Sequence, residues 1–362
     1  VQTCALPIYS FAAGMEISTS KTSNTPYVVS TGSGSCSAAD IAAYFCTSLA
    51  NPDPNDPWTG TVTKGSFTNR TTSDEAAFYA FDTITIIPQL LLNGGVRWNR
   101  YTVHANGYRS NNTINYNERV RSTDWSWQGG VVFKPRENAS LYFSWANSST
   151  PPGSDAGEGT FGLTDTTGNY APAKTENWEI GGKIDLFGGA LGLTAALFQL
   201  DRSNIRDVDP NTGAQAIIAN KARIKGVEVG ASGTVGPVSL FAGYTYADSE
   251  LRDGTTDEGN ALPNAPKHNV AATASVKVSN ALSIGGGAYH SSKRYADNAN
   301  LISAPGYWRF DANAAYQISD HFDLRLNVQN LGDKRYIIKL RNPHFAVPAA
   351  GRQALVTLTA TY

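Results

Sequence analysis

The alternation of apolar and polar positions is clearest in the last fifteen residues, Pro348 to Tyr362. In an extended strand, successive side chains point to opposite faces. One face of this segment would carry Ala354, Val356, Leu358, Ala360 and Tyr362. The other would carry Gln353, Leu355, Thr357, Thr359 and Thr361, four of which are polar. An outer-membrane β-barrel presents an apolar face to lipid and a polar face to its lumen, and the terminal aromatic favours such a barrel.

The same period-two alternation recurs along the chain and predicts strands rather than helices. One apolar face consists of Trp178, Ile180, Ile184 and Leu186, opposite Asn177, Glu179, Lys183 and Asp185. Two later segments have apolar faces of Trp308, Phe310, Ala312, Ala314, Tyr316 and Ile318, and of Leu324, Leu326 and Val328. We expect Glu228, which lies between Val227 and Val229, to line the lumen.

The connections between these segments fall into a short and a long class, which alternate along the chain. The short ones are Pro88-Gln89, Lys134 to Asn138, Gly188-Gly189, Gly236-Pro237, Ser279-Asn280 and Asp320-His321. The long, polar ones are Lys21 to Ser66, Arg109 to Arg121, Ser149 to Lys174, Asp207 to Gly213, Leu251 to Pro266, Asp297 to Pro305 and Arg341 to Ala349. Outer-membrane barrels show this asymmetry between tight periplasmic turns and long extracellular loops.

Together the segments predict an all-β fold, a transmembrane antiparallel β-barrel with about fourteen strands of barrel length. Plugged outer-membrane transporters have about 22 strands, so about eight strands and the missing plug domain are expected upstream. We expect residues 1–9 to be non-native, because Val1 to Ile8 resembles the translation of a common sequencing-adapter stretch. Residues 10–362 are then the C-terminal part of the barrel.

Composition agrees with a barrel. Charged residues make up 16% of the chain, below the roughly 25% of ordinary soluble domains. Mean hydropathy is only -0.29, and no apolar run is long enough for a spanning helix. A barrel strand needs an apolar residue only at every second position. The net charge of -1 lacks the basic excess of a general nucleic-acid binder, so no nucleic-acid partner is expected.

Two of the three cysteines, Cys36 and Cys46, bracket a short segment inside the first long loop. In an oxidising compartment they are expected to form a disulfide. The alternative is two unpaired buried thiols, which the polar character of the loop disfavours. Cys4 belongs to the stretch that we exclude as non-native.

Several short stretches, each weak by itself, form a series along residues 10–362. They are Asn51 to Trp58, Tyr79 to Thr85, Gly94 to Arg97, Thr175 to Lys183, Leu193 to Phe198, Arg223 to Gly230, Phe241 to Glu250, Leu262 to Lys267, Asn330 to Tyr336 and Gly351 to Tyr362. In this order they resemble the TonB-dependent outer-membrane receptors. The Cys36/Cys46 loop and Gly157-Glu158-Gly159 favour the catecholate siderophore receptors among them. Gly332 departs from the pattern, since such receptors usually carry Phe there.

This resemblance implies the location, the function and the partners of the whole protein. It would lie in the outer membrane of a Gram-negative bacterium, in contact with outer-membrane lipid, and take up a ferric siderophore by active transport. In the family, a plug occludes the pore and the TonB energy-coupling complex pulls it through an N-terminal box. Both segments are expected upstream of this chain. No cofactor is implied, because iron arrives within its siderophore.

A ferric catecholate is bulky, aromatic and negatively charged, so its site needs cations for charge and aromatic faces for stacking. Extracellular strand ends and loops supply both, and the candidate ligand-binding residues are Trp58, Tyr108, Arg109, Tyr170, Arg206, Arg223, Lys293, Arg294 and Tyr295. Each has an alternative role. Tyr and Trp also form the aromatic girdle of a barrel, and Lys and Arg also meet lipopolysaccharide or solvent.

No catalytic residue and no metal site are predicted, and an enzyme is not expected. Gly157 to Gly162 match a dinucleotide-binding pattern but lack its strand–helix context. The segment Asp207 to Gly213 imitates a calcium loop without the closing Glu. The five histidines show no metal-ligand spacing.

Three rival functions share part of this pattern. A passive porin-like channel has the same alternation but no plug. A TonB-dependent receptor for another cargo, such as a hydroxamate siderophore, haem or a glycan, would differ in its loops. A secreted β-sandwich adhesin would be soluble without detergent.

Overall fold

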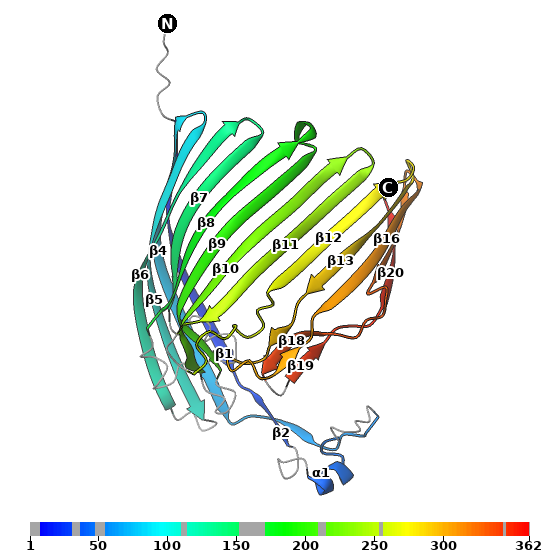
Figure 1. The fold of residues 1–362 in the computed structure, drawn as a ribbon. Helices are drawn as coiled ribbons and strands as arrows, with labels where there is room; N and C mark the ends of the chain where they lie inside the picture. Colours follow the sequence, from blue (N-terminus) through cyan, green and yellow to red (C-terminus); the bar gives the residue numbers. More distant parts are fainter. Residues whose placement is uncertain are drawn as a thin grey trace.

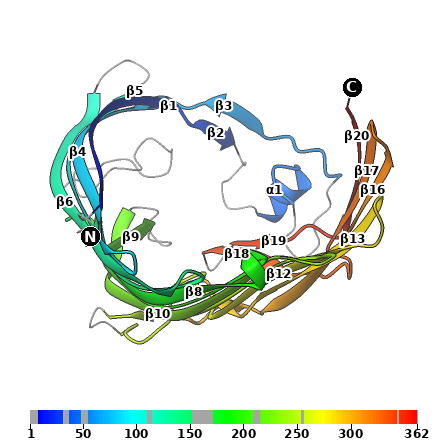
Figure 2. The same cartoon turned by 90° about the horizontal axis from the view of Figure 1, so that it is seen from above.

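The computed structural model describes residues 8–30, 37–47, 55–109, 114–151, 171–208, 215–252, 256–342 and 345–361. Most of them form one antiparallel sheet of 14 strands, which curves into an arc (Figures 1 and 2). Its strands are β1 (Ile8–Asn24), β4 (Phe67–Ile87), β5 (Leu90–Arg109), β6 (Ile114–Arg136), β7 (Ala139–Thr150), β8 (Ala173–Leu186), β9 (Leu191–Val208), β10 (Gln215–Val235), β11 (Val238–Leu251), β12 (His268–Lys277), β13 (Leu282–Ser291), β16 (Tyr307–Ser319), β17 (Phe322–Gln329) and β20 (Gln353–Ala360). The predicted all-β fold and its strand count are confirmed.

Within this sheet, each strand pairs with the strands that precede and follow it in the series. Such a meander needs only hairpin connections, as in membrane barrels. Among the described strands, β1 and β20 have a neighbour on one side only, so they form the two edges of the arc. No helix in the described ranges combines the length and the apolar character needed to cross a membrane.

The six predicted short connections join adjacent strands at one end of the sheet, the upper end in Figure 1. One of them contains a 3-10 turn, η1 (Phe187–Gly189). Gly188 and Gly236 have φ values of 66° and 59°, which glycine adopts without the steric cost that a Cβ would add. Glycine at these positions therefore allows the tight turns, so the sequence alone already indicates where they form.

The long connections lie at the opposite end and contain smaller elements. These are α1 (Ala38–Ala42) and the two-stranded pairs β2 (Tyr27–Ser30) with β3 (Thr61–Lys64), β14 (Arg294–Tyr295) with β15 (Ser303–Ala304), and β18 (Ile337–Asn342) with β19 (Phe345–Pro348). A capping box of Ser37 and Asp40 begins α1, because each side chain binds the backbone N–H of the other residue.

Several of the predicted loops contain strand residues, and two examples show why. β6 begins at Ile114, inside the predicted loop Arg109 to Arg121, and its pairing with β5 extends to Tyr108. The predicted loop Arg341 to Ala349 contains β19 and the end of β18. Both errors have one cause. Polar side chains predict exposure to water, whereas main-chain pairing continues wherever a neighbouring strand supplies partners.

Contacts of β16 distinguish the two faces of the sheet. Tyr307 stacks on Tyr336, which directly precedes β18, with ring centroids 4.0 Å apart. The β18–β19 hairpin lies on the concave side of the arc (Figure 2), so Tyr307 points to that side. Trp308 and Phe310 alternate with it and point to the convex side. In the membrane-spanning parts of the strands the register has no shift. The pairing therefore extends this assignment from β16 to β1 in one direction and to β20 in the other.

The convex face is apolar, as predicted. The predicted apolar residues on it include Trp178, Ile180, Leu326, Val328, Ala354 and Val356. Aromatic pairs on the same face are Trp125–Trp127, Trp145–Trp178 and His290–Trp308. An apolar band with aromatic residues at its border is the lipid-facing surface of an outer-membrane barrel. Glu228 lies on the concave face, as expected for a lumen-lining residue.

Four aromatic rings on the concave face each cover a glycine in a neighbouring strand. The pairs are Tyr79 with Gly14, Phe81 with Gly95, Tyr142 with Gly181, and Phe198 with Gly226. In every pair, a Cβ added to the glycine would lie within 2.6 Å of the ring. The ring thus fills the space that the missing side chain leaves in the strand interior.

Most of the buried apolar residues within the described ranges belong to three small clusters. These are Val103, Ala105 and Val120; Ile205, Ala222 and Leu251; and Ala296, Ala304 and Leu340. The third cluster joins the β14–β15 pair to β18. A single curved sheet has no second layer to pack against, so most of its apolar side chains must be covered by lipid.

Candidate functional site

A cluster of cations and aromatic rings lies on the concave face, near the long-loop ends of β13 and β16. We call it the inner cluster, and its members are Tyr289, Arg294, Tyr307, Arg309 and Tyr336. Arg309 lies directly opposite Tyr289 in the register, with its Cζ atom 4.2 Å from the ring centroid. The Cζ atom of Arg294 lies 5.5 Å from the centroid of Tyr307. Two guanidinium groups and three phenol rings therefore meet at one place.

Hydrogen bonds hold the two guanidinium groups of the inner cluster in position. Arg294 is only 6% exposed and donates to the hydroxyl of Ser291, at 3.2 Å, and to the backbone carbonyl of Ile338. Arg309 donates from Nη2 to Oδ2 of Asp311, at 2.8 Å. Arg294 thus connects β13 to the β18–β19 hairpin. Arg309 is held by Asp311 on its own strand and by a side-chain hydrogen bond to Tyr336.

The two arginines differ in what they offer to a ligand. Burial restricts Arg294 to orienting Tyr307 and the hairpin. The Arg309 side chain is 28% exposed and retains donors beyond the one that binds Asp311. A guanidinium with free donors beside phenol rings suits an anionic aromatic ligand, because it combines charge, planar hydrogen bonding and stacking.

Three of the predicted ligand residues lie at or beside the inner cluster. Arg294 is a member, and Lys293 and Tyr295 flank it in the chain. The Nζ atom of Lys293 lies 4.5 Å from the centroid of Tyr295, so this exposed cation and half-buried ring form a second charged and aromatic pair.

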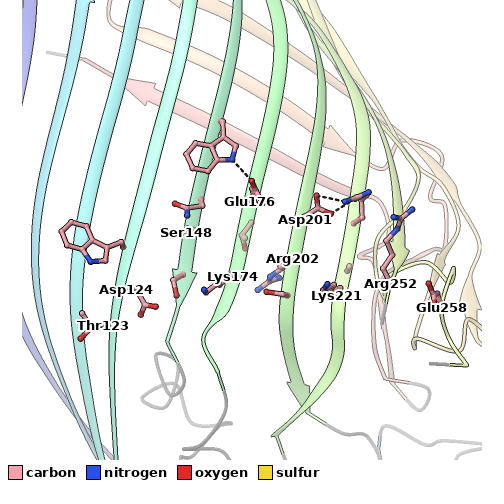
Figure 3. Close-up of a pocket in the computed structure, with 18 residues that line it drawn as sticks. Thr123, Asp124, Ser148, Lys174, Glu176, Asp201, Arg202, Lys221, Arg252 and Glu258 are labelled. Carbon is pink, nitrogen blue, oxygen red and sulfur yellow. Dashed lines mark hydrogen bonds and ion pairs between the residues drawn. The ribbon is translucent and has the colours of Figure 1, made fainter. Parts of the chain in front are cut away.

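Two other predicted residues have local partners instead. Arg223 lies on the convex face and binds Asp201, with Nε 2.6 Å from Oδ1 (Figure 3). It shares that face with Val227 and Val229, so it points away from the lumen. Trp58 donates from Nε1 to the backbone carbonyl of Phe45, at 3.1 Å, and so anchors the chain after α1.

The remaining predictions fall on residues without described side chains. Tyr170, Cys36 and the segment Gly157 to Gly162 lie outside the described residues. Tyr108, Arg109 and Arg206 are placed only as strand residues at the long-loop ends of β5 and β9. Cys46 is disulfide-bonded, and its pairing with Cys36 stays a prediction.

Sequence reasoning missed most of the inner cluster. A signal was present, because Arg309 falls on the polar face of a predicted strand, and Tyr307 shares that face. What was missing is the register between β13 and β16. Only that register brings Tyr289 opposite Arg309, and only the β18 hairpin brings Tyr336 onto Tyr307.

A second polar network crosses β1, β4 and β5 on the concave face. Arg97 binds Glu16 with an N–O distance of 2.9 Å and Glu75 with one of 3.3 Å. On β7 and β8, the Tyr142 hydroxyl donates to the Glu179 carboxylate. These groups form ion pairs and hydrogen bonds with each other across neighbouring strands. Lumen-facing charged side chains that bind no ligand are stabilised in this way.

Comparison with known proteins decides the family. Residues 18–331 match the family described as TonB dependent receptor-like, beta-barrel. The chain belongs to this TonB-dependent receptor family. The siderophore receptor PiuA of Acinetobacter baumannii is 34% identical to it, over 97% of this chain and 50% of that protein. The catecholate siderophore receptor Fiu of Escherichia coli is 26% identical, over 85% of this chain and 44% of that protein.

Solved structures of TonB-dependent receptors share the fold. The crystal structure of PiuA superposes with a TM-score of 0.87 at 32% identity, covering 99% of this chain and 54% of that one. The closed form of Fiu superposes with a TM-score of 0.80, covering 98% of this chain and 52% of that one. At 22% identity, this second likeness supports the fold alone.

As a TonB-dependent receptor barrel, the chain lies in the outer membrane of a Gram-negative bacterium. The predicted family, fold and location are therefore confirmed, and the lipid-facing convex surface agrees with them. The chain spans about half the length of the curated relatives that it matches.

Proposed function

We propose that this chain forms the barrel wall and the ligand site of a receptor for the active, TonB-dependent uptake of ferric siderophores. The catecholate type of siderophore is favoured. The relatives support the cargo class, since PiuA is called a siderophore receptor and Fiu a catecholate siderophore receptor. Under this proposal the protein is a transport receptor and not an enzyme. Its partners are the ferric siderophore and the TonB energy-coupling complex.

The choice of a catecholate cargo rests on the residues of the inner cluster. A ferric catecholate brings negative charge and flat aromatic rings to the same site. Arg309 offers a partly exposed guanidinium. Tyr289 offers a ring directly opposite it on β13, and Tyr307 offers one two residues away on β16. Cation–π contacts and charged hydrogen bonds both strengthen where the lumen excludes water.

Under this proposal, the receptor binds the ligand from the extracellular side and releases it to the periplasm in a separate step. The long connections and the inner cluster bind it at the extracellular end of the barrel. The TonB complex then moves the plug and opens a path to the periplasm. The ion-paired network of Arg97, Glu16 and Glu75 belongs to the wall of that path.

Uptake of radiolabelled iron tests this proposal. The receptor is assembled in the outer membrane of cells that lack their own siderophore receptors, with and without a functional TonB complex. We expect TonB-dependent uptake of a ferric catecholate, with little uptake of a ferric hydroxamate or haem. Uptake that is independent of TonB would favour a porin-like channel. TonB-dependent uptake of another cargo alone would favour a receptor for that cargo.

A further inference from the structure

Three of the long connections, at the lower end of the sheet in Figure 1, are bonded to each other. The first follows β11 and includes residues 256–267. The second joins β13 to β16 through residues 292–306, and the third follows β17 and includes residues 330–342. We call them together the loop block. The uptake mechanism uses Arg294 and Tyr336 from it, and the bonds that hold the block together have no role in that mechanism so far.

Asn264 joins the first connection to both of the others. Its side-chain amide binds the peptide groups of one residue of β18 in both directions, because Nδ2 donates to the carbonyl of Leu340 and Oδ1 accepts from the Leu340 N–H at 2.9 Å. The backbone N–H of Asn264 donates to the carbonyl of Tyr295 in the second connection, at 2.9 Å. The amide thus satisfies the main chain of β18 as a neighbouring strand would.

Asn300 makes the same kind of two-way bond from the second connection to the first. Its Oδ1 atom accepts from the N–H of Ala261 and its Nδ2 atom donates to the Ala261 carbonyl, both at 2.9 Å. Asn264 and Asn300 have φ values of 55° and 58°, in the left-handed region that Asn adopts more readily than most residues. Backbone conformation and side-chain amide therefore favour the same residue type at both positions.

The second and third connections are joined by a buried cation and by apolar contact. Arg294 donates to the backbone carbonyl of Ile338. Ala296 and Ala304 pack against Leu340 in a buried cluster. Each of the three connections is thus bonded directly to the other two. One of them can move by itself only if it breaks its contacts with both neighbours, so we expect the three to open together.

The loop block supplies two members of the inner cluster. From the third connection, Tyr336 stacks on Tyr307 and shares a side-chain hydrogen bond with Arg309. From the second connection, Arg294 lies over the ring of Tyr307. A movement of the third connection would therefore take Tyr336 away from both of its partners and the Ile338 carbonyl away from Arg294. The geometry of the inner cluster depends on whether the loop block stays closed.

We propose that Asn264 and Asn300 are positioning residues, which lock the loop block into one unit and thereby preorganise the inner cluster for its ligand. Both amides are occupied by backbone partners, so they act through Tyr336 and Arg294. Preorganisation raises affinity, because the free receptor has already lost the conformational freedom that ligand binding would otherwise remove. The identity of the ligand rests on the proposed function, whereas the locking of the three connections does not.

Hydrogen exchange of the whole receptor in detergent, read by mass spectrometry, tests the locking without any ligand. Asn300→Gly removes the amide but keeps a residue that tolerates positive φ. We expect exchange at Leu340 to rise about fivefold, although the amide of Asn300 binds Ala261 in a different connection. Glu258→Gln, at an exposed position of the first connection, is the control and is expected to leave Leu340 unchanged. Heat-modifiable migration on a gel checks that each variant is folded. A rise confined to the segment around Ala261 overturns the proposal.

A second exchange measurement uses only the unaltered receptor, so it holds even where a variant fails to assemble. Urea is added at concentrations below those that unfold the barrel, and exchange at Ala261 and Leu340 is followed in parallel. Residues of one cooperative unit open with the same free energy and the same dependence on urea. We expect the two amides to coincide in both quantities. Different urea dependences overturn the proposal.

Binding of a ferric tris-catecholate, measured by quenching of tryptophan fluorescence, tests the effect on the site. We expect Asn264→Gly and Asn300→Gly each to weaken binding about fivefold. The double variant is expected to be weakened by about the same factor, because either change opens the same unit. Asn300→Asp, which keeps the acceptor for the Ala261 N–H, is expected to lie between Asn300→Gly and the unaltered receptor. Unchanged affinity in variants whose exchange has risen overturns the positioning role. Absence of binding by the unaltered receptor refutes the proposed cargo instead, and the locking is then decided by exchange alone.

Discussion

The ring of Phe198 on β9 covers Gly226 on β10. A Cβ added to Gly226 would lie 2.3 Å from the Cζ atom of Phe198 and 2.3 Å from the backbone oxygen of Tyr246. The register pairs Gly226 directly with Phe198, and strand pairing holds the Tyr246 oxygen in place. Packing by its neighbours therefore requires glycine at this position.

Gly226→Ala is expected to destabilise the folded barrel by about 1 to 3 kcal/mol, because the added methyl group overpacks the site. Gly243→Ala on β11 is the matched control, since nothing lies within 4 Å of its Cβ position. That change is expected to be neutral or stabilising by up to about 1 kcal/mol. The measurement is the temperature at which the folded, fast-migrating band disappears on a gel. Equal temperatures for both variants would contradict the packing argument.

Val229 and Glu228 provide a test of the two faces, because they are adjacent in β10 but point to opposite sides. Val229→Arg puts a charge on the lipid side and is expected to cost about 2 to 4 kcal/mol near the bilayer centre. Glu228→Arg puts the same charge on the lumen side and is expected to cost much less. Folding in lipid vesicles against urea measures both. A larger loss for Glu228→Arg would reverse the face assignment.

Arg309→Gln tests the inner cluster as the cargo site and rests on the proposed function. Loss of the guanidinium is expected to weaken ferric-catecholate binding about tenfold, since one charged hydrogen bond and its stacking are removed. Arg97→Gln is the control, because that guanidinium on the same face is already paired with Glu16 and Glu75. Quenching of tryptophan fluorescence by the ligand reports the affinity. A similar loss in both variants would point to the overall lumen charge instead.

The two edges of the arc predict how the 362-residue chain behaves when expressed alone. β1 and β20 each leave one side of their main chain unpaired among the described strands. In lipid, each unsatisfied backbone group costs several kcal/mol, so we expect aggregation or degradation. Size-exclusion chromatography in detergent and limited proteolysis measure this. A monodisperse, protease-resistant product would show that the arc closes or pairs by another route.

The disulfide of Cys46 is expected to join it to Cys36. Mass spectrometry of peptides from the non-reduced protein should find residues 36 and 46 linked, and reduction should separate them. A link from Cys46 to Cys4 would refute both this pairing and the exclusion of the first residues as non-native.

Strand number, turn positions and the apolar face could all be predicted before the structure was known. These predictions rest on residues such as Trp178 and Val356, whose face follows from side-chain alternation within one strand, and on residues that favour turns. The site was predicted less well. Arg294 was a candidate because it lies among the cations and aromatic residues of the extracellular strand ends and loops, whereas Tyr289 and Arg309 are ordinary strand residues until the register joins them. Arg223 was a candidate because it lies near the extracellular end of a strand, and only the register places it on the face that it shares with Val227.

Side-chain alternation is a property of one strand, so the residues alone establish which positions share a face and where the chain turns. Pairing between strands and the curvature of the sheet are collective properties of all 14 strands. They bring Arg309 to Tyr289 and turn the face of Arg223 outward. A shift of one residue in register would move every side chain of a strand to the other face. The tertiary structure therefore decided which charged groups face the ligand path and which face the membrane.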